Sequence, residues 1–141
     1  GSTIIQIVDD GIEALHDDLI GNLDLSLAYN AQTATSGNCD PSGNDSHGTK
    51  CAGITSARGF NGIGIRGISP LGKVTGFKFR TNNNGGFYVN KRELEKAWIS
   101  GDGANDITVS SNSWATCVNN STQYEEILKW GSENLRDGKG R

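Results

Sequence analysis

Hydrophobic and polar positions form two alternating kinds of pattern along the chain. Short apolar runs rich in β-branched residues, typical of strands, occupy residues 3–10, 73–79 and 106–114, with a weaker run at 25–29. Helical patterns lie at 48–57, 90–98 and 122–135, and a polar loop ends at Ser46. Because strands and helices alternate, we predict an α/β fold, a parallel sheet with helices on both faces.

Composition and charge narrow the function classes. The 141 residues suit one domain, and 20 glycines with only 34% hydrophobic residues indicate tight turns and close backbone approaches. A net charge of -3 without a basic stripe argues against a nucleic-acid partner, and no apolar run approaches membrane length.

The spacing of the cysteines indicates neither a metal site nor a particular disulfide pattern. Cys39, Cys51 and Cys117 lack the paired spacing of a zinc ribbon. One disulfide with one free thiol and three free thiols are both compatible with the sequence, so the cysteines alone assign no compartment.

Candidate chemistry gathers where the predicted strands end. In parallel sheets functional residues lie at the carboxyl ends of the strands, which here points to Asp9, Asp10, residues 80–86 and residues 113–117. His47, at the start of the predicted helix, falls on the same side. We expect these segments to converge on one cleft.

Asp9 and His47 have an ordinary and a catalytic interpretation. Alone, Asp9 is a turn residue in "DDG" and His47 a capping residue, with Ser46 or Asp45 available as the helix cap. The positive helix terminus favours a neutral imidazole that can accept a proton. If Asp9 bonds the other ring nitrogen, it fixes the tautomer and stabilises the imidazolium formed in catalysis.

The flanking residues favour the catalytic interpretation. "IVDDGIEALHDDL" followed by "HGTKCAG" closely resembles the aspartate and histidine motifs of the subtilisin-like serine proteases, and most of all their kexin and furin branch. "ISPLGKVTGFKF" and "VSSNSWA" follow in the family's order, so the resemblance covers essentially the whole chain. It implies a triad aspartate at Asp9, a general base at His47 and a secreted or extracytoplasmic protein. It also implies a subtilisin-like three-layer fold, with residues 1–141 as the amino-terminal part of the catalytic domain.

The resemblance also implies a substrate-binding segment. Ser113, Trp114 and Ala115 would pair with a peptide or protein substrate and line the pocket before the scissile bond, whereas without the resemblance they are an ordinary strand end. Asp10 matches an acidic residue near the neighbouring substrate position. The kexin-like enzymes have glycine where Ala115 stands, followed by acidic residues that are absent here, so a preference for basic substrates stays open.

A structural calcium ion is the implied cofactor. The glycine-punctuated loop "RGFNGIGI" corresponds to a family calcium loop, although such loops by themselves usually bind nothing. The matching ligands are the side chains of Asp18 and Asn61 and the carbonyls of Arg58, Ile63 and Ile65. Asp17 replaces a usual proline, and a further family ligand precedes residue 1.

The nucleophile is not among the matched motifs. The family places an Asn and then a Gly-Thr-Ser segment after the next strand, and no serine here has that context, so we expect this chain alone to be inactive. Cys51, one helical turn after His47, could be mistaken for a nucleophile but is predicted to be a packed thiol beneath the imidazole.

Three explanations follow. The chain is part of a serine endopeptidase that acts with the carboxy-terminal part of its own domain, or a truncated, inactive domain that binds peptide or calcium, or a small α/β binding module unrelated to proteases. We favour the first.

Overall fold

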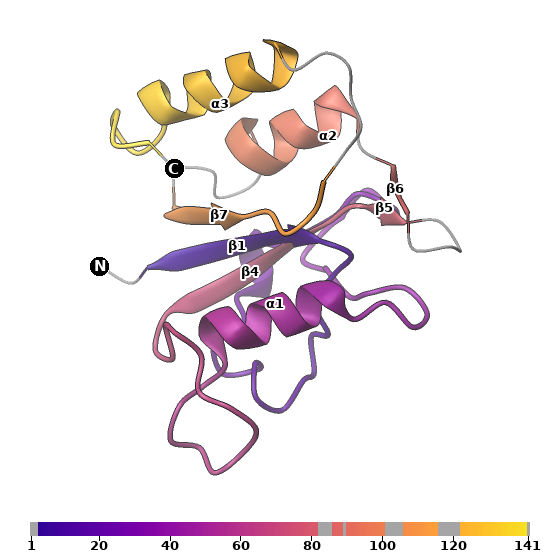
Figure 1. Ribbon diagram of the computed structural model, residues 1–141, viewed down its shortest axis with the longest axis vertical. Coiled ribbons are helices and arrows are strands. Elements are labelled where there is room, and N and C mark those ends of the chain that lie inside the picture. The colour runs from indigo at the N-terminus through magenta and orange to yellow at the C-terminus, as the bar shows by residue number, and fades with distance from the viewer. Residues whose placement is uncertain (1–2, 82–85, 89, 101–105, 116–121, 141) are drawn as a thin grey trace.

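The computed structural model is a three-layer arrangement around one mixed sheet (Figure 1). It describes residues 3–81, 86–88, 90–100, 106–115 and 122–140, with no account of the side chains of residues 87, 88 and 100. The sheet order is β3-β2-β4-β1-β7. Its strands are β1 (Ile4–Asp9), β2 (Tyr29–Asn30), β3 (Thr35–Ser36), β4 (Lys73–Lys78) and β7 (Val109–Ser111). The pairs are parallel except for β2 with β3, which confirms the α/β prediction.

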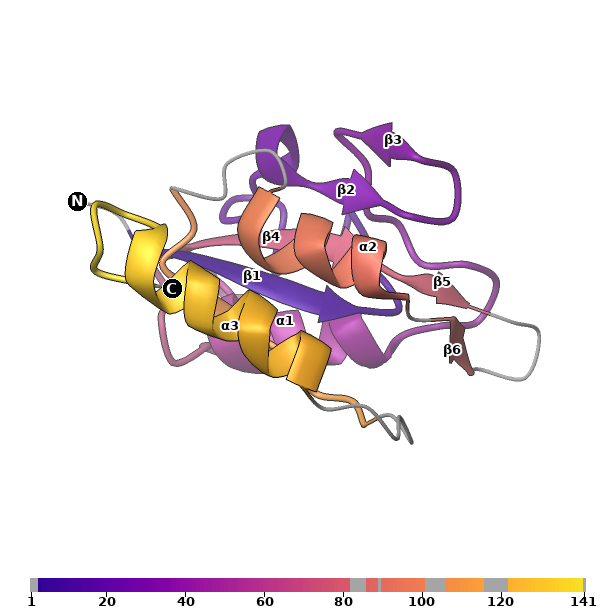
Figure 2. The same ribbon diagram turned by 90° about the horizontal axis from the view of Figure 1, so that it is seen from above.

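The helices lie on opposite faces of the sheet. Helix α1 (His47–Ser56) covers one face, while α2 (Lys91–Glu95) and α3 (Thr122–Asn134) cover the other (Figures 1 and 2). A π-helical turn, η2 (Lys96–Ser100), continues α2 without a break. None of the helices in the described residues is both long and apolar enough to cross a membrane.

The central strands are buried on both faces because α-helices pack on each side. Ile5, Ile7 and Val74 belong to the core under α1. Val8 and Phe77 point to the opposite face of the sheet and belong to the second core, under α2. Alternation along the strands therefore sends Val74, Gly76 and Lys78 to the α1 face.

Helix α1 approaches the sheet closely through small residues. Gly48 and Ala52 are buried. A Cβ added to Gly48 would overlap the carbonyl oxygen of Gly11 and would lie 2.9 Å from the Cβ of Asp9. The absence of that atom brings the first turn of α1 directly against the end of β1.

Two predicted strands were wrong in extent. Residues 25–29 form mainly a 3-10 turn, η1 (Leu25–Leu27), because the carboxylate of Asp24 accepts a hydrogen bond from the backbone N–H of Ser26. The strand predicted at 106–114 shrinks to β7. A short hairpin, β5 (Arg80–Thr81) with β6 (Phe87–Tyr88), was not predicted.

The carboxyl ends of β1 and β4 lie side by side, since Asp9 is the register partner of Lys78. Helix α1 begins at the same edge, because the imidazole of His47 reaches Asp9. Figure 2 shows the β5–β6 hairpin beyond this edge.

Candidate active site

Asp9 and His47 meet at the end of β1. The Nδ1 atom of His47 lies 2.9 Å from Oδ1 and 3.0 Å from Oδ2 of Asp9. An ionised carboxylate only accepts hydrogen bonds, so Nδ1 carries the proton and Nε2 keeps its lone pair. Asp9 is buried, whereas the side chain of His47 is 55% exposed. The imidazole is thus oriented from beneath and open toward solvent.

Asp10 holds the first turn of α1 in place. Its Oδ2 accepts from the backbone N–H of His47 at 3.0 Å, and its Oδ1 accepts from that of Gly48 at 2.7 Å. Ser46, at the cap position, makes no side-chain cap bond, so the prediction that Ser46 or Asp45 caps the helix was wrong. Both oxygens of Asp10 serve the helix, and its part in substrate binding stays a prediction.

The pKa values of His47 and Asp9 are both raised, for different physical reasons. Hydrogen bonding to Asp9 raises the pKa of His47 above its usual value, and partial burial opposes this rise. This direction is opposite to the one expected from the helix terminus, because contact with the Asp9 carboxylate favours the charged imidazole. Burial raises the pKa of Asp9, opposed by its hydrogen bonds to His47 and to the N–H of Asp10.

Cys51 lies one turn along α1, as the spacing predicted. Its Sγ is 3.9 Å from both ring nitrogens of His47, and the residue is half-buried rather than enclosed. Asp9, His47 and Cys51 together place one potential metal-ligand atom each within 4.8 Å of the others. The Asp9–His47 hydrogen bond already uses Nδ1. Cys39 and Cys51 are free thiols, and Cys117 falls outside the described residues.

The predicted substrate segment follows β7 and is partly exposed. Ser113 and Ala115 are exposed, while Trp114 stacks on Trp98 at 6.3 Å and meets the edge of Phe79 at 5.1 Å between ring centroids. These ring contacts hold the side chain of Trp114, and with it this segment, against the protein. Its contact with substrate stays a prediction.

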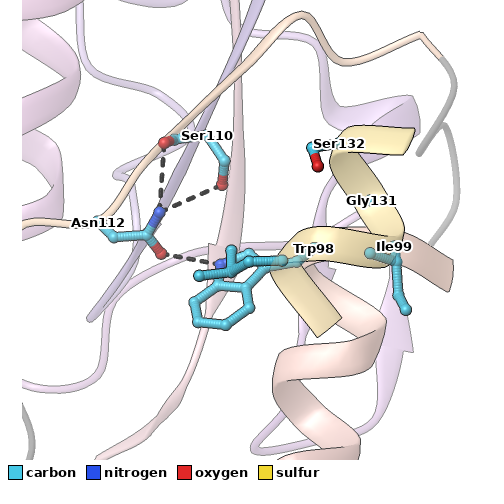
Figure 3. A pocket seen from close by; sticks show the side chains of 7 residues that line it. Trp98, Ile99, Ser110, Asn112, Gly131 and Ser132 are labelled. Carbon is cyan, nitrogen blue, oxygen red and sulfur yellow. Dashed lines mark hydrogen bonds between the residues drawn. The ribbon is translucent and has the colours of Figure 1, made fainter. Parts of the chain in front are cut away.

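Asn112 ties the same segment to the helices above it. Its side chain accepts from Trp98 Nε1 at 3.0 Å and donates to the carbonyl of Ser110 at 3.2 Å (Figure 3). Beside it lies a cavity of about 100 Å³ between β7, η2 and α3, and Ile99 and Gly131 are among the residues that line it.

The predicted calcium loop folds around Asp18. The buried carboxylate accepts from Asn61 Nδ2 at 2.9 Å and from the N–H of Ile65 at 2.8 Å. These contacts lower its pKa. Gly64 has φ +53, and a Cβ there would overlap Asp18 Oδ2, so glycine lets the loop close on the carboxylate. The amide nitrogen of Asn61 faces Asp18, while its Oδ1 accepts from the N–H of Ile63 at 3.3 Å. A carboxylate, an amide oxygen and loop carbonyls are the oxygen ligands that calcium takes, and the set of Asp18, Asn61, Arg58, Ile63 and Ile65 stays a prediction.

Comparison with known families decides the ancestry of this site. Residues 1–139 match the subtilase family, peptidase S8. The chain belongs to the subtilase family. The hypothesis of an unrelated binding module is therefore excluded, and the resemblance of the aspartate and histidine motifs is confirmed.

Individual subtilases agree with this assignment. The extracellular serine protease of Aeromonas sobria is 31% identical over 98 residues, covering 67% of this chain and 14% of that protein. Human proprotein convertase subtilisin/kexin type 6 is 35% identical over 80 residues, covering 55% and 8%. The crystal structure of the Aeromonas sobria serine protease superposes with a TM-score of 0.77 at 25% identity, over 92% of this chain and 22% of that one. The subtilase chain described here thus spans less than a quarter of these relatives.

Proposed function

We propose that this chain forms the aspartate- and histidine-bearing part of a serine endopeptidase, whose nucleophilic serine lies on sequence outside these 141 residues. The observation that supports it is the Asp9–His47 pair, in which Nδ1 of His47 lies 2.9 Å from Oδ1 of Asp9 and the His47 side chain is 55% exposed.

Each residue of the pair has a distinct role in the proposed reaction. His47 Nε2 removes the proton from the serine hydroxyl as it attacks the peptide carbonyl, and later delivers it to the leaving amine. Asp9 keeps the proton of His47 on Nδ1 and stabilises the imidazolium between these steps. Backbone groups of residues 113–115 pair with the substrate strand, so that main-chain bonds give affinity and pockets give selectivity.

The partner within the proposed enzyme is the remainder of the same domain. Large apolar side chains are exposed on α1 and on the loop after it: Ile54 in the helix is 61% exposed, and Phe60, Ile68 and Leu71 in the loop are 88%, 86% and 84% exposed. Several large apolar side chains exposed within one short stretch of chain favour an interface here. A subtilase segment that spans only a fraction of its relatives would bury this surface against the rest of the domain.

Calcium is the proposed structural cofactor of the same protein, held by Asp18, Asn61 and the loop carbonyls. Its binding would stabilise the folded state by mass action, about 2.7 kcal/mol at a hundredfold excess over the dissociation constant. We expect millimolar Ca²⁺ to raise the melting temperature relative to a chelator, and Asp18→Asn to abolish the rise. Asp17→Asn, in the neighbouring exposed residue, is the matched control. Equal melting temperatures with and without Ca²⁺ would contradict the proposal.

Secretion is proposed on the strength of the relatives. The similar Aeromonas protein is named as an extracellular protease.

The decisive experiment compares the 141-residue chain with the longer protein that contains it. We expect the parent to hydrolyse peptides and to react with an active-site serine probe, and the chain alone to do neither. His47→Ala in the parent should remove hydrolysis, with His16→Ala, at the only other histidine, as control. Unchanged turnover of His47→Ala would refute the assignment, and a parent without a reactive serine would favour an inactive binding domain.

A further inference from the structure

A buried lysine lies beside the proposed catalytic pair. Lys78 ends β4, is 2% exposed and is the register partner of Asp9. Partners in parallel strands project to the same face, so both side chains leave the sheet on the α1 side. A lysine this deeply buried needs compensating partners, and the proposed reaction gives it no task.

The partners of Lys78 come from the segments that lead to His47. Its ammonium donates to Ser42 Oγ, and the carboxylates of Asp45, Asp10 and Asp40 counter the burial that lowers its pKa. The thiol of Cys39 is the remaining titratable neighbour.

One of these carboxylates caps the first turn of α1, and another lies just before the helix in the chain. Asp10 accepts from the N–H groups of His47 and Gly48. Asp45, two residues before His47, accepts from the hydroxyl of Thr81 at 3.0 Å. Through its bond to Ser42 and the charges of these carboxylates, Lys78 links the end of β4 to the residues that precede and cap α1.

We propose that Lys78 is a positioning residue for His47: its ammonium neutralises the carboxylates around the 40–46 loop and holds that loop, and with it the first turn of α1, against the end of β1. The catalytic meaning of this role rests on the proposed function.

The adjoining pocket, of about 500 Å³, explains why the cation is needed there. It is lined by polar groups of the β2–β3 region, among them Asn30 and Gln32, and by Asp40, Ser42 and Lys78. Without the cation, three like charges would repel one another next to open, solvated space, and the loop would move outward. The same carboxylates oppose an anionic ligand, so the pocket favours a support role over a binding site.

The ionisation of His47 reports its position. His47 faces Asp9 at the end of β1 and Asp10 directly after it, and has Lys50 and Cys51 on its own helix. Its raised pKa depends first on contact with Asp9, so displacement lowers that pKa toward the usual value. Loss of a nearby positive charge without movement would instead raise it.

The test is an NMR titration of the two histidines in the 141-residue chain, with His16 as internal reference. We expect Lys78→Met to shift the pKa of His47 downward and Ser42→Ala to shift it less in the same direction. Lys73→Met should leave it unchanged, because Lys73 begins the same strand at its far end and donates to Gly21.

An unchanged or raised pKa of His47 in folded Lys78→Met would overturn the proposal. If that variant does not fold, Ser42→Ala decides, and an unshifted His47 there overturns it equally. The titration involves no serine, so an inactive parent enzyme would refute the proposed function alone. In an active parent, the acid limb of kcat/KM should move to lower pH in the same variants.

Discussion

At the scale of single residues, Asp10 shows how one carboxylate stabilises the start of a helix. Asp10→Ala would leave two backbone N–H groups at the buried end of α1 without acceptors, those of His47 and Gly48. We expect a loss of about 1–3 kcal/mol of unfolding free energy, and a smaller loss for Asp10→Asn, which keeps one acceptor. Urea denaturation measures both. Asp17→Ala, at an exposed position, is the control, and a loss as small as the control's would show that water replaces the cap.

The Asp9–His47 contact also makes stability depend on pH. The folded pKa of His47 is raised, so its contribution is complete below the unfolded value of 6.5 and is lost as the pH rises through the folded value. Burial raises the folded pKa of Asp9 as well, so its effect has the same sign, and stability falls as the pH rises above 3.8. The measurement starts at pH 6 to separate the two groups.

We therefore expect the stability difference between the wild type and His47→Asn to shrink from pH 6 to pH 9. The imidazole is largely exposed, so the change should stay below about 1 kcal/mol. A difference that grows with pH would mean that the histidine is destabilised by its surroundings.

At the scale of elements, the packing of α1 on β1 requires glycine at position 48 but not at position 53. Gly48→Ala would place a methyl group against the backbone of Gly11, whereas at Gly53, in the same helix, an added methyl group would meet nothing within 4 Å. We expect Gly48→Ala to cost about 1–3 kcal/mol and to lower the pKa of His47, since the helix must move. Gly53→Ala should stabilise by about 0.5–1 kcal/mol. Equal effects in thermal unfolding would contradict this account of the contact.

Elements were predictable where local pattern decides them. The first strand, the α1 helix and the strand at 73–78 follow from uninterrupted apolar or small-residue patterns, and each differs from prediction by two residues at most. The strand predicted at 25–29 was wrong because a local hydrogen bond, from the N–H of Ser26 to the carboxylate of Asp24, competes with strand pairing. The cap of α1 could not be found from sequence, because Asp10 and His47 are 37 positions apart. The doubled aspartate was its only signal.

At the scale of the whole molecule, the exposed apolar side chain of Ile54 on α1 offers a test of whether this chain folds as an independent unit or packs against the rest of a larger domain. Ile54 is 61% exposed in this chain, so Ile54→Lys should change its stability by no more than about 0.5 kcal/mol. In the longer parent protein the same side chain would be covered by the rest of the domain, and a buried, unpaired ammonium would cost several kcal/mol. Leu128→Lys on α3, across the sheet, is the matched control and should be mild in both forms. Unfolding midpoints of the four variant proteins decide the question: a longer protein whose midpoint is unchanged by Ile54→Lys would mean that α1 faces solvent there.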